Sequence, residues 1–251
     1  MIIISGPCQI ESRDHCLMMA ERIAEIAQRV GQEIIFKASF DKANRTSGAS
    51  PRGVGLDEAI LIFAEIRAMG LRITTDVHEP WQVAEIAPVV DVIQIPALLS
   101  RQTDLIAAAG RSGKVVSIKK GQFMAPEDIE HAARKAGPAP VWAIERGSSF
   151  GYHNLVVDMR SFAVMRPHVS AMIFDATHSV QSPAGLGTSS GGNRAMIAPL
   201  ALAAMAAGAD GLFIETHDDP DNALSDGPCM LPVDYLEGLL RRARDVQSAA
   251  K

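Results

Sequence analysis

Short apolar runs alternate with longer amphipathic stretches along the whole chain. The runs are rich in Ile and Val and do not alternate between apolar and polar residues, a pattern typical of parallel strands buried on both faces. We therefore predict strands at residues 2–5, 34–38, 72–76, 91–95, 115–119, 141–145, 171–174 and 211–215.

The stretches between these runs have the periodicity of helices with one apolar face. Predicted helices cover residues 15–30, 56–69, 81–87, 103–109, 126–136, 194–207 and 233–249, and residues 155–167 are a weaker candidate. Gly31, Gly70, Gly110 and Gly137 each follow a predicted helix and are expected to end it in a left-handed conformation.

This alternation predicts an α/β fold, a (β/α)8 TIM barrel with residues 1–251 forming a single catalytic domain. An open doubly wound sheet is the alternative, but eight strand–helix units in a chain of 251 residues favour a closed barrel. Since the chemistry of such barrels lies at the carboxyl ends of the strands, the residues that follow each run are the candidates for a site.

The composition is that of an ordinary globular protein, with 47% hydrophobic and 21% charged residues. The net charge of −5, from 24 basic and 29 acidic residues, argues against a nucleic-acid-binding surface. No apolar stretch is long enough to span a bilayer, residues 1–4 lack the basic flank of a signal peptide, and the 3 cysteines suggest no disulfide framework. We expect a cytoplasmic protein with neither a membrane nor a nucleic-acid partner.

Basic side chains follow most of the predicted strands. They are Lys37, Lys42, Arg45, Arg101, Lys119, Lys120 and Arg146. A net-acidic protein that gathers cations at one barrel mouth is expected to bind phosphate or carboxylate groups. Thr46, Ser47 and the glycine-rich residues 185–192 can add hydroxyl or backbone N–H donors. Lys120 can equally be a solvated surface charge.

Four residues with metal-binding side chains lie at or after strand ends: Cys8, His178, Glu215 and Asp226. One thiolate, one imidazole and two carboxylates can together hold a divalent ion, and this set suits Zn²⁺, Fe²⁺, Mn²⁺ or Co²⁺ better than Mg²⁺ or Ca²⁺. Alternatively, Cys8 is a small packing residue and His178 a core histidine bonded to a carbonyl. Cys16 lies within a predicted helix and is expected to serve packing.

Several ordered blocks closely resemble the signature of the 3-deoxy-D-manno-octulosonate-8-phosphate synthases, and the resemblance runs from Gly6 to about Leu236. The blocks are KASFDKANR at 37–45, TDVHEP at 75–80, IQIPA at 93–97, RQTD at 101–104, ERG at 145–147, FGY at 150–152, NLVVD at 154–158, DATHSV at 175–180 and LFIE at 212–215.

The resemblance implies a homotetrameric (β/α)8 barrel that condenses phosphoenolpyruvate with D-arabinose 5-phosphate and water. The products are 3-deoxy-D-manno-octulosonate 8-phosphate and inorganic phosphate, in the lipopolysaccharide (Kdo) biosynthesis of a Gram-negative-type cytosol. The family divides into metal-dependent members with Cys at the position of Cys8 and metal-independent members with Asn there. The resemblance therefore implies a divalent metal held by Cys8, His178, Glu215 and Asp226, and no organic cofactor.

The same resemblance implies roles for individual residues. The phosphoenolpyruvate contacts are Lys37, Lys42, Gln94, Lys119 and Arg146. Asn44, Arg45 and Thr46 match contacts to arabinose 5-phosphate, and Arg101 matches an arginine that reaches the sugar phosphate of a neighbouring subunit. We include Asp76 and His78 in the substrate-binding network. We assign catalytic roles to Lys42, Asn44, His178 and Asp226, with His178 and Asp226 as candidates for proton transfer.

Two segments, residues 48–51 and 228–232, depart from the usual family sequence. They belong to the loops expected to contact the sugar and the metal, so the detailed geometry of these loops is expected to differ from that of the family.

Three alternative functions stay open. The sister 3-deoxy-D-arabino-heptulosonate 7-phosphate synthase, which uses erythrose 4-phosphate, typically has Lys-Pro-Arg-Thr where this chain has Lys42-Ala-Asn-Arg-Thr46. A metallohydrolase barrel usually has a His-x-His pair after its first strand, where this chain has Cys8. A catalytically silent barrel would bind sugar phosphates without turnover.

Overall fold

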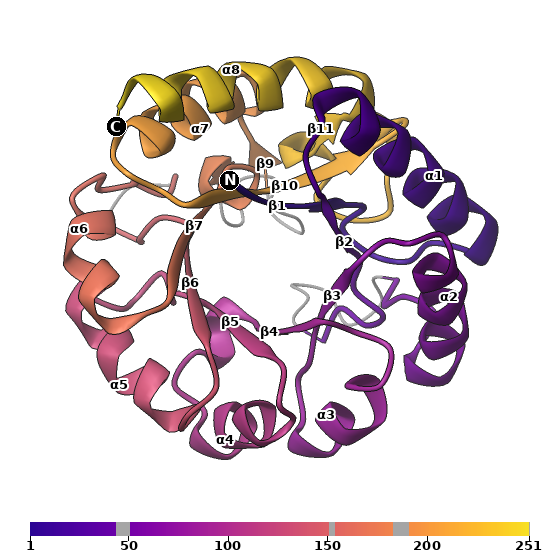
Figure 1. Cartoon of the computed structure of the whole chain (residues 1–251), viewed down its shortest axis with the longest axis horizontal. Coiled ribbons are helices and arrows are strands. Elements are labelled where there is room, and N and C mark those ends of the chain that lie inside the picture. Colours follow the sequence, from indigo (N-terminus) through magenta and orange to yellow (C-terminus); the bar gives the residue numbers. More distant parts are fainter. Residues whose placement is uncertain (44–50, 151–153, 183–190, 251) are drawn as a thin grey trace.

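The computed structural model of the chain describes residues 1–43, 51–150, 154–182 and 191–250. Within these ranges, parallel strands close into a barrel because β1 pairs with β2 on one side and with β10 on the other. Figure 1 looks down this ring of strands, which the helices surround. The ring is formed by β1 (Ile2–Gly6), β2 (Ile35–Lys37), β3 (Ile73–Asp76), β4 (Val92–Ile95), β5 (Val115–Lys119), β6 (Val141–Glu145), β7 (Ala171–Asp175) and β10 (Gly211–His217). The predicted (β/α)8 barrel is confirmed.

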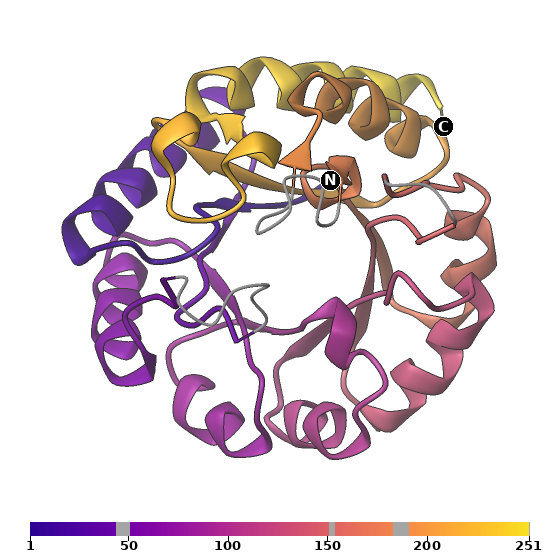
Figure 2. The ribbon, with the colours of Figure 1, turned by 180° about the vertical axis from the view of Figure 1, so that it is seen from behind.

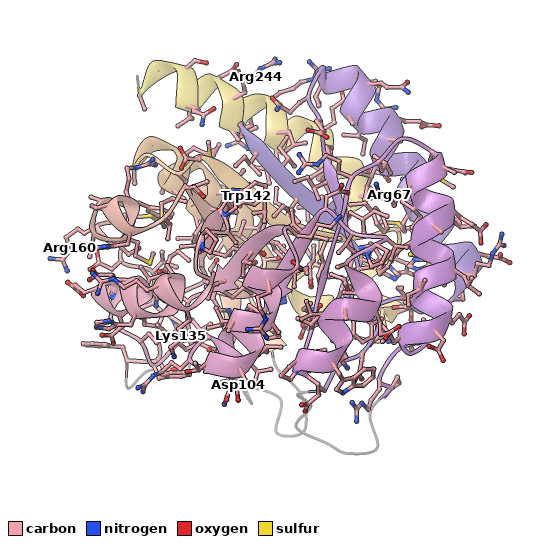
Figure 3. All side chains as sticks on the ribbon, turned by 60° about the horizontal axis from the view of Figure 1, so that its bottom comes forward. Arg67, Asp104, Lys135, Trp142, Arg160 and Arg244 are labelled. Atoms are coloured by element: carbon pink, nitrogen blue, oxygen red, sulfur yellow. The ribbon has the colours of Figure 1, made fainter. Side chains whose placement is uncertain are left out.

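The helices alternate with the strands and form the outer layer of the barrel. They are α1 (Arg13–Val30), α2 (Leu56–Ala68), α3 (Pro80–Ile86), α4 (Thr103–Arg111), α5 (Ile129–Lys135), α6 (Ser161–Met165), α7 (Ile197–Ala206) and α8 (Leu236–Ala249). Figure 3 shows side chains of this outer layer, such as Arg67, Asp104 and Arg244, on the outside of the ring. None of the described helices has the length and apolar character needed to cross a membrane.

Two apolar layers hold the barrel together, because successive side chains of a strand point to opposite faces. A large layer lies between the strands and the helices. A small layer fills the barrel interior and consists of Ile4, Ile35, Val92, Ile144, Ile173 and Phe213, against which Ile2, Val115 and Trp142 pack. Phe213 forms the boundary to the polar mouth, since the Lys119 Nζ lies 3.9 Å from its ring centroid and the Lys37 Nζ lies 5.5 Å from it.

Two small additions to the barrel were not predicted from the sequence. β8 (Gln181–Ser182) pairs antiparallel with β9 (Gly191–Gly192), and β11 (Leu231–Pro232) pairs with the end of β10. Both belong to connections that leave the carboxyl ends of β7 and β10. Figure 2 shows the barrel from the end opposite to that seen in Figure 1. Strands of two residues carry no periodicity that a sequence pattern could reveal.

The predicted glycine caps hold at three of four positions. Gly31, Gly70 and Gly137 adopt φ values of 61°, 87° and 63°, which glycine tolerates because it lacks a Cβ. The prediction for Gly110 is wrong, because α4 continues to Arg111. A Cβ at position 110 would lie 2.1 Å from the carbonyl oxygen of Ala136, so Gly110 permits α4 to approach the end of α5 closely.

Candidate active site

The carboxyl ends of the barrel strands bring together most of the residues that the sequence singled out. Lys37, Asp76 and Lys119 are the last residues of their strands, and Glu215 lies near the end of β10. Cys8 and His178 come shortly after the ends of β1 and β7. Asp226 comes from the loop between β10 and β11. Asn44, Arg45 and Thr46, the predicted contacts to the sugar phosphate, lie outside the described residues.

The four predicted metal ligands converge. Ligand atoms of Cys8, Glu215 and Asp226 all lie within 4.8 Å of one another, and the Cys8 Sγ lies 3.4 Å from the Asp226 Oδ2. The Nε2 of His178 faces the same group, at 3.3 Å from the Glu215 Oε2 and 3.6 Å from the Asp226 Oδ2. This arrangement supports the interpretation of Cys8 and His178 as site residues over the alternative of packing.

Two further observations show that these residues fit a divalent ion. The buried Glu215 Oε2 has no hydrogen-bond partner among the described residues. The His178 Nδ1 lies 2.8 Å from the Asp175 Oδ2, which orients the ring with Nε2 toward the carboxylates. A carboxylate behind a metal-binding histidine commonly fixes the ring in this way.

Burial and neighbouring charges set the protonation of this group. Burial, followed by the charge of Glu215, raises the pKa of the Cys8 thiol. Burial opposes the charged form of His178, but Asp175 and Glu215 outweigh it and raise the pKa of the imidazole. Burial also disfavours ionisation of Glu215, yet His178 and Lys37 outweigh it and lower the pKa of that carboxyl to about 2. These shifts favour the protonated forms of Cys8 and His178, and a metal ion that used both as ligands would displace those protons.

Two buried lysines stand in ion pairs directly above Phe213. The Lys37 Nζ lies 2.6 Å from the Glu215 Oε1 and donates to the carbonyl of Cys8 at 3.0 Å. The Lys119 Nζ lies 2.6 Å from the Asp175 Oδ2. Burial lowers the pKa of Lys119, although Asp175 opposes this shift. An anion that entered the site would compete with these carboxylates for the ammonium groups.

Arg146 completes the cationic part of the mouth. Its side chain is buried, and its Nη2 donates to the Gln181 Oε1 at 2.5 Å and to the carbonyl of His178 at 3.2 Å. Gln94, on strand β4, is also buried, and its Oε1 has no hydrogen-bond partner in the described part of the chain. Anionic groups of a substrate could pair with the buried cations, whereas the unpaired amide oxygen of Gln94 needs a hydrogen-bond donor such as a hydroxyl group or water.

A chain of hydrogen bonds links Lys42 to Asp76 and His78. The Lys42 Nζ donates to the Ser39 Oγ at 2.9 Å, and Ser39 donates to the Asp76 Oδ1 at 2.5 Å. The His78 Nε2 lies 3.3 Å from the Asp76 Oδ2. Burial opposes ionisation of Asp76, but His78 and Lys42 outweigh it and hold the pKa of Asp76 well below its ordinary value. Ser39 was not among the residues predicted from the sequence, although it lies two residues after the end of β2 and within the block at 37–45.

Lys120 corrects one alternative taken from the sequence. Its side chain is only 1% exposed, so the interpretation as a solvated surface charge is wrong. The Nζ donates to the Ser148 Oγ at 3.0 Å and lies 3.6 Å from the Glu145 Oε2. Lys120 therefore connects the ends of β5 and β6, next to Lys119 and Arg146.

Arg101 and Cys16 lie apart from this group. Arg101 is exposed just before α4, and its carbonyl accepts a hydrogen bond from the Lys135 Nζ at 2.7 Å. Cys16 is fully buried in α1, as predicted. Cys229, in the loop that carries Asp226, is also buried, and its Sγ lies 3.6 Å from the carbonyl of Gly191.

A polar cluster that the sequence did not predict lies beside the site. The His15 Nε2 and the His217 Nδ1 lie 3.0 Å and 3.1 Å from the Asp218 Oδ1, and the His217 Nε2 lies 3.4 Å from the Glu11 Oε1. The backbone N–H of Asp219 donates to the His217 Nδ1 at 2.9 Å, so the proton of a neutral His217 resides on Nε2, toward Glu11. The cluster thus connects the loops after β1 and β10.

Comparisons with known proteins find one family and relatives of one name that match the whole or nearly the whole chain. The family described as DAHP synthetase I matches residues 1–251. A relative from a Bradyrhizobium species, named 2-dehydro-3-deoxyphosphooctonate aldolase, is 54% identical over 256 aligned residues that cover 100% of this chain and 90% of the relative. Relatives of the same name from Rhodopseudomonas palustris and Brucella anthropi are 54% and 51% identical, and the alignments cover 99% of this chain and 88% and 91% of the relatives.

Proposed function

Because this chain belongs to the DAHP synthetase I family, we propose that it catalyses the reaction for which its relatives are named, that of 2-dehydro-3-deoxyphosphooctonate aldolase. In this reaction phosphoenolpyruvate and D-arabinose 5-phosphate condense with water to 3-deoxy-D-manno-octulosonate 8-phosphate and inorganic phosphate. The observation that carries the proposal is the convergence of buried Lys37, Lys119 and Arg146 with the group of Cys8, His178, Glu215 and Asp226.

The chemistry explains why the site needs these cations. Carbon 3 of phosphoenolpyruvate bonds to the aldehyde carbon of the sugar, water adds its oxygen at carbon 2, and the bond from carbon 2 to the phosphate oxygen breaks. The two substrates are both anions, so they repel each other unless cations hold them in place. Lys37, Lys42, Lys119 and Arg146, together with the amide of Gln94, are the groups we assign to phosphoenolpyruvate.

The reaction also requires proton transfers, since the water loses a proton and the aldehyde oxygen gains one. His178 and Asp226 face each other at 3.6 Å and are the residues we assign to these transfers. The hydrogen-bonded chain from Lys42 through Ser39 to Asp76 and His78 holds the Lys42 ammonium in a fixed position. Asn44, Arg45 and Thr46 are our assignment for arabinose 5-phosphate, with Asn44 close to the reacting groups.

We also propose that the reaction depends on a divalent metal, either Zn²⁺, Fe²⁺, Mn²⁺ or Co²⁺. Cys8, His178, Glu215 and Asp226 would hold it, as their convergence supports, together with the buried Glu215 Oε2, which makes no hydrogen bond to the described residues. When bound, such an ion supplies Lewis acidity, which can polarise a carbonyl or lower the pKa of water. The thiolate disfavours Mg²⁺ and Ca²⁺.

Finally, we propose a homotetramer in the bacterial cytoplasm that serves lipopolysaccharide synthesis. In this assembly Arg101 of one subunit reaches the sugar phosphate bound by its neighbour. The exposed position of Arg101 beside α4 supports this assignment, because an exposed arginine is free to contact another subunit.

Rates of phosphate release with two sugars test the reaction. Metal-replete protein with phosphoenolpyruvate should release phosphate rapidly with arabinose 5-phosphate and much more slowly with erythrose 4-phosphate. A preference for erythrose 4-phosphate would contradict the choice of sugar. Phosphate release from the sugar phosphate alone would favour a metallohydrolase, and binding without turnover would favour a silent barrel.

A further inference from the structure

Asp226 has an unusual backbone conformation. With φ 52° and ψ 22°, it is the one non-glycine residue with positive φ in the described part of the chain. L-residues rarely adopt this left-handed region, although aspartate tolerates it better than most. Such a conformation persists only where the surrounding structure fixes it. Here it accompanies a carboxylate that lies 3.4 Å from the Cys8 Sγ and 3.6 Å from the His178 Nε2.

Arg194 fixes the chain immediately after Asp226. This arginine begins the 3₁₀ turn η5 (Arg194–Met196), which leads into α7. Its Nη2 donates to the carbonyl of Gly227 at 2.8 Å and to the Asp221 Oδ1 at 2.9 Å. The Gly227 carbonyl also accepts the backbone N–H of Met230 at 3.2 Å. Arg194 therefore joins a segment before α7 to two positions of the loop that carries Asp226.

Close packing confines the same loop from two sides. A Cβ added at Gly192, in β9, would lie 2.2 Å from the Cys229 Sγ, and one added at Gly227 would lie 2.3 Å from the carbonyl oxygen of Pro220. The first contact is with a side chain of the loop and the second is with its backbone, so both positions accept only glycine without a shift of the loop. Arg194 contributes side-chain hydrogen bonds to this arrangement, and a substitution can remove them without adding atoms.

We infer that Arg194 is a positioning residue for the metal site. By holding the Gly227 carbonyl, it keeps Asp226 in the left-handed conformation that presents its carboxylate to Cys8 and His178. The inference rests on the proposed metal-dependent function. Residues that support a metal ligand typically change metal affinity by about 10- to 100-fold when they are removed, and we expect a loss of about 10-fold for Arg194.

Metal affinity of the purified full chain tests this role. Co²⁺ binding is measured by competition with a chelator for the wild type, Arg194→Met, Arg194→Lys and Asp221→Asn. Methionine retains the apolar stem of the arginine but not its donors, so Arg194→Met should bind Co²⁺ about 10-fold more weakly. Lysine keeps one charged donor and should restore part of the affinity. Asp221→Asn leaves the bond to Gly227 intact and should bind like the wild type.

A double-mutant cycle with Asp226 separates positioning from general damage. If Arg194 acts through Asp226, then Arg194→Met should cause no further loss of Co²⁺ affinity in the Asp226→Ala background. The visible absorption of bound Co²⁺ should change in Arg194→Met and not in Asp221→Asn. Equal affinity of Arg194→Met and wild type, or an equal loss in both backgrounds, would overturn the inference. Failure of the wild type to bind Co²⁺ would instead overturn the metal proposal itself.

Discussion

Glu215 shows how a single side chain serves both halves of the site. Its Oε1 lies 2.6 Å from the Lys37 Nζ, among the cations assigned to phosphoenolpyruvate, and its Oε2 lies 3.3 Å from the His178 Nε2, among the proposed metal ligands. A buried charge of this kind requires compensation from both neighbours. Substitutions in either half are therefore expected to affect the other, and single residues are best tested with matched controls.

The two buried thiols Cys8 and Cys16 offer such a comparison. Cys8→Ala should weaken Zn²⁺ or Co²⁺ binding by more than about 100-fold, because it removes a proposed ligand and not merely a supporting residue. Cys16→Ala should lower the free energy of unfolding by about 1 kcal/mol and leave metal affinity unchanged, since Cys16 only packs within α1. Chelator competition and denaturant unfolding measure the two effects. Equal metal affinity in Cys8→Ala and the wild type would exclude Cys8 as a ligand.

Lys120 gives a prediction about stability. Lys120→Met leaves Glu145 buried without its cationic neighbour, and breaking a buried pair on one side typically costs about 3 kcal/mol or more. The double variant Lys120→Met/Glu145→Gln removes both charges and should recover part of this loss. Urea unfolding of the metal-free proteins provides the measurement. A double variant no more stable than the single one would show that the pair is not what Lys120 contributes.

At the scale of elements, the sequence predicted the strands because each is a short continuous apolar run, and the long helices because each carries the periodicity of an amphipathic helix. It failed where a feature depends on contacts between distant segments. The β8–β9 pair and β11 are too short to show a pattern, and α6 is confined to Ser161–Met165 within the weakly predicted stretch. The role of Gly110 depends on the Ala136 carbonyl of another element, which no local signal reveals.

Gly110 and Gly238 test whether a glycine within a helix is required by close packing. Gly110→Ala places a Cβ against the Ala136 carbonyl and should destabilise the barrel by about 1–3 kcal/mol. Gly238 lies in α8 with nothing near its potential Cβ, so Gly238→Ala should stabilise the protein by up to about 1 kcal/mol. Thermal or denaturant unfolding of both variants decides the matter. Gly110→Ala as stable as Gly238→Ala would contradict the close approach of α4 and α5.

At the scale of the whole molecule, barrel topology explains why the site could be largely predicted. Because all parallel strands end at the same mouth, Cys8, Lys37, Lys119 and Glu215 had to lie near one another. Topology does not fix burial or loop conformation, however. The burial of Lys120 and the left-handed backbone of Asp226 arise from packing between loops, and the sequence did not predict either.

The proposed sharing of active sites between subunits predicts complementation. Arg101→Ala and Lys37→Met tetramers should each be nearly inactive, the first lacking the donated arginine and the second a phosphoenolpyruvate contact. After subunit exchange, some sites combine an intact Lys37 with a neighbour's intact Arg101, so activity should reappear. Phosphate release from the mixed sample measures this. Exchange without any recovery, or full activity of Arg101→Ala alone, would contradict the shared site.

The central claim is that a metal held at Cys8, His178, Glu215 and Asp226 is required for the condensation of phosphoenolpyruvate with arabinose 5-phosphate. The most direct measurement is phosphate release by the wild type after thorough demetallation, followed by addition of Mn²⁺ or Zn²⁺. We predict that demetallation abolishes phosphate release and that the added ion restores part of it. Full activity in protein shown by metal analysis to be free of divalent ions would contradict the claim.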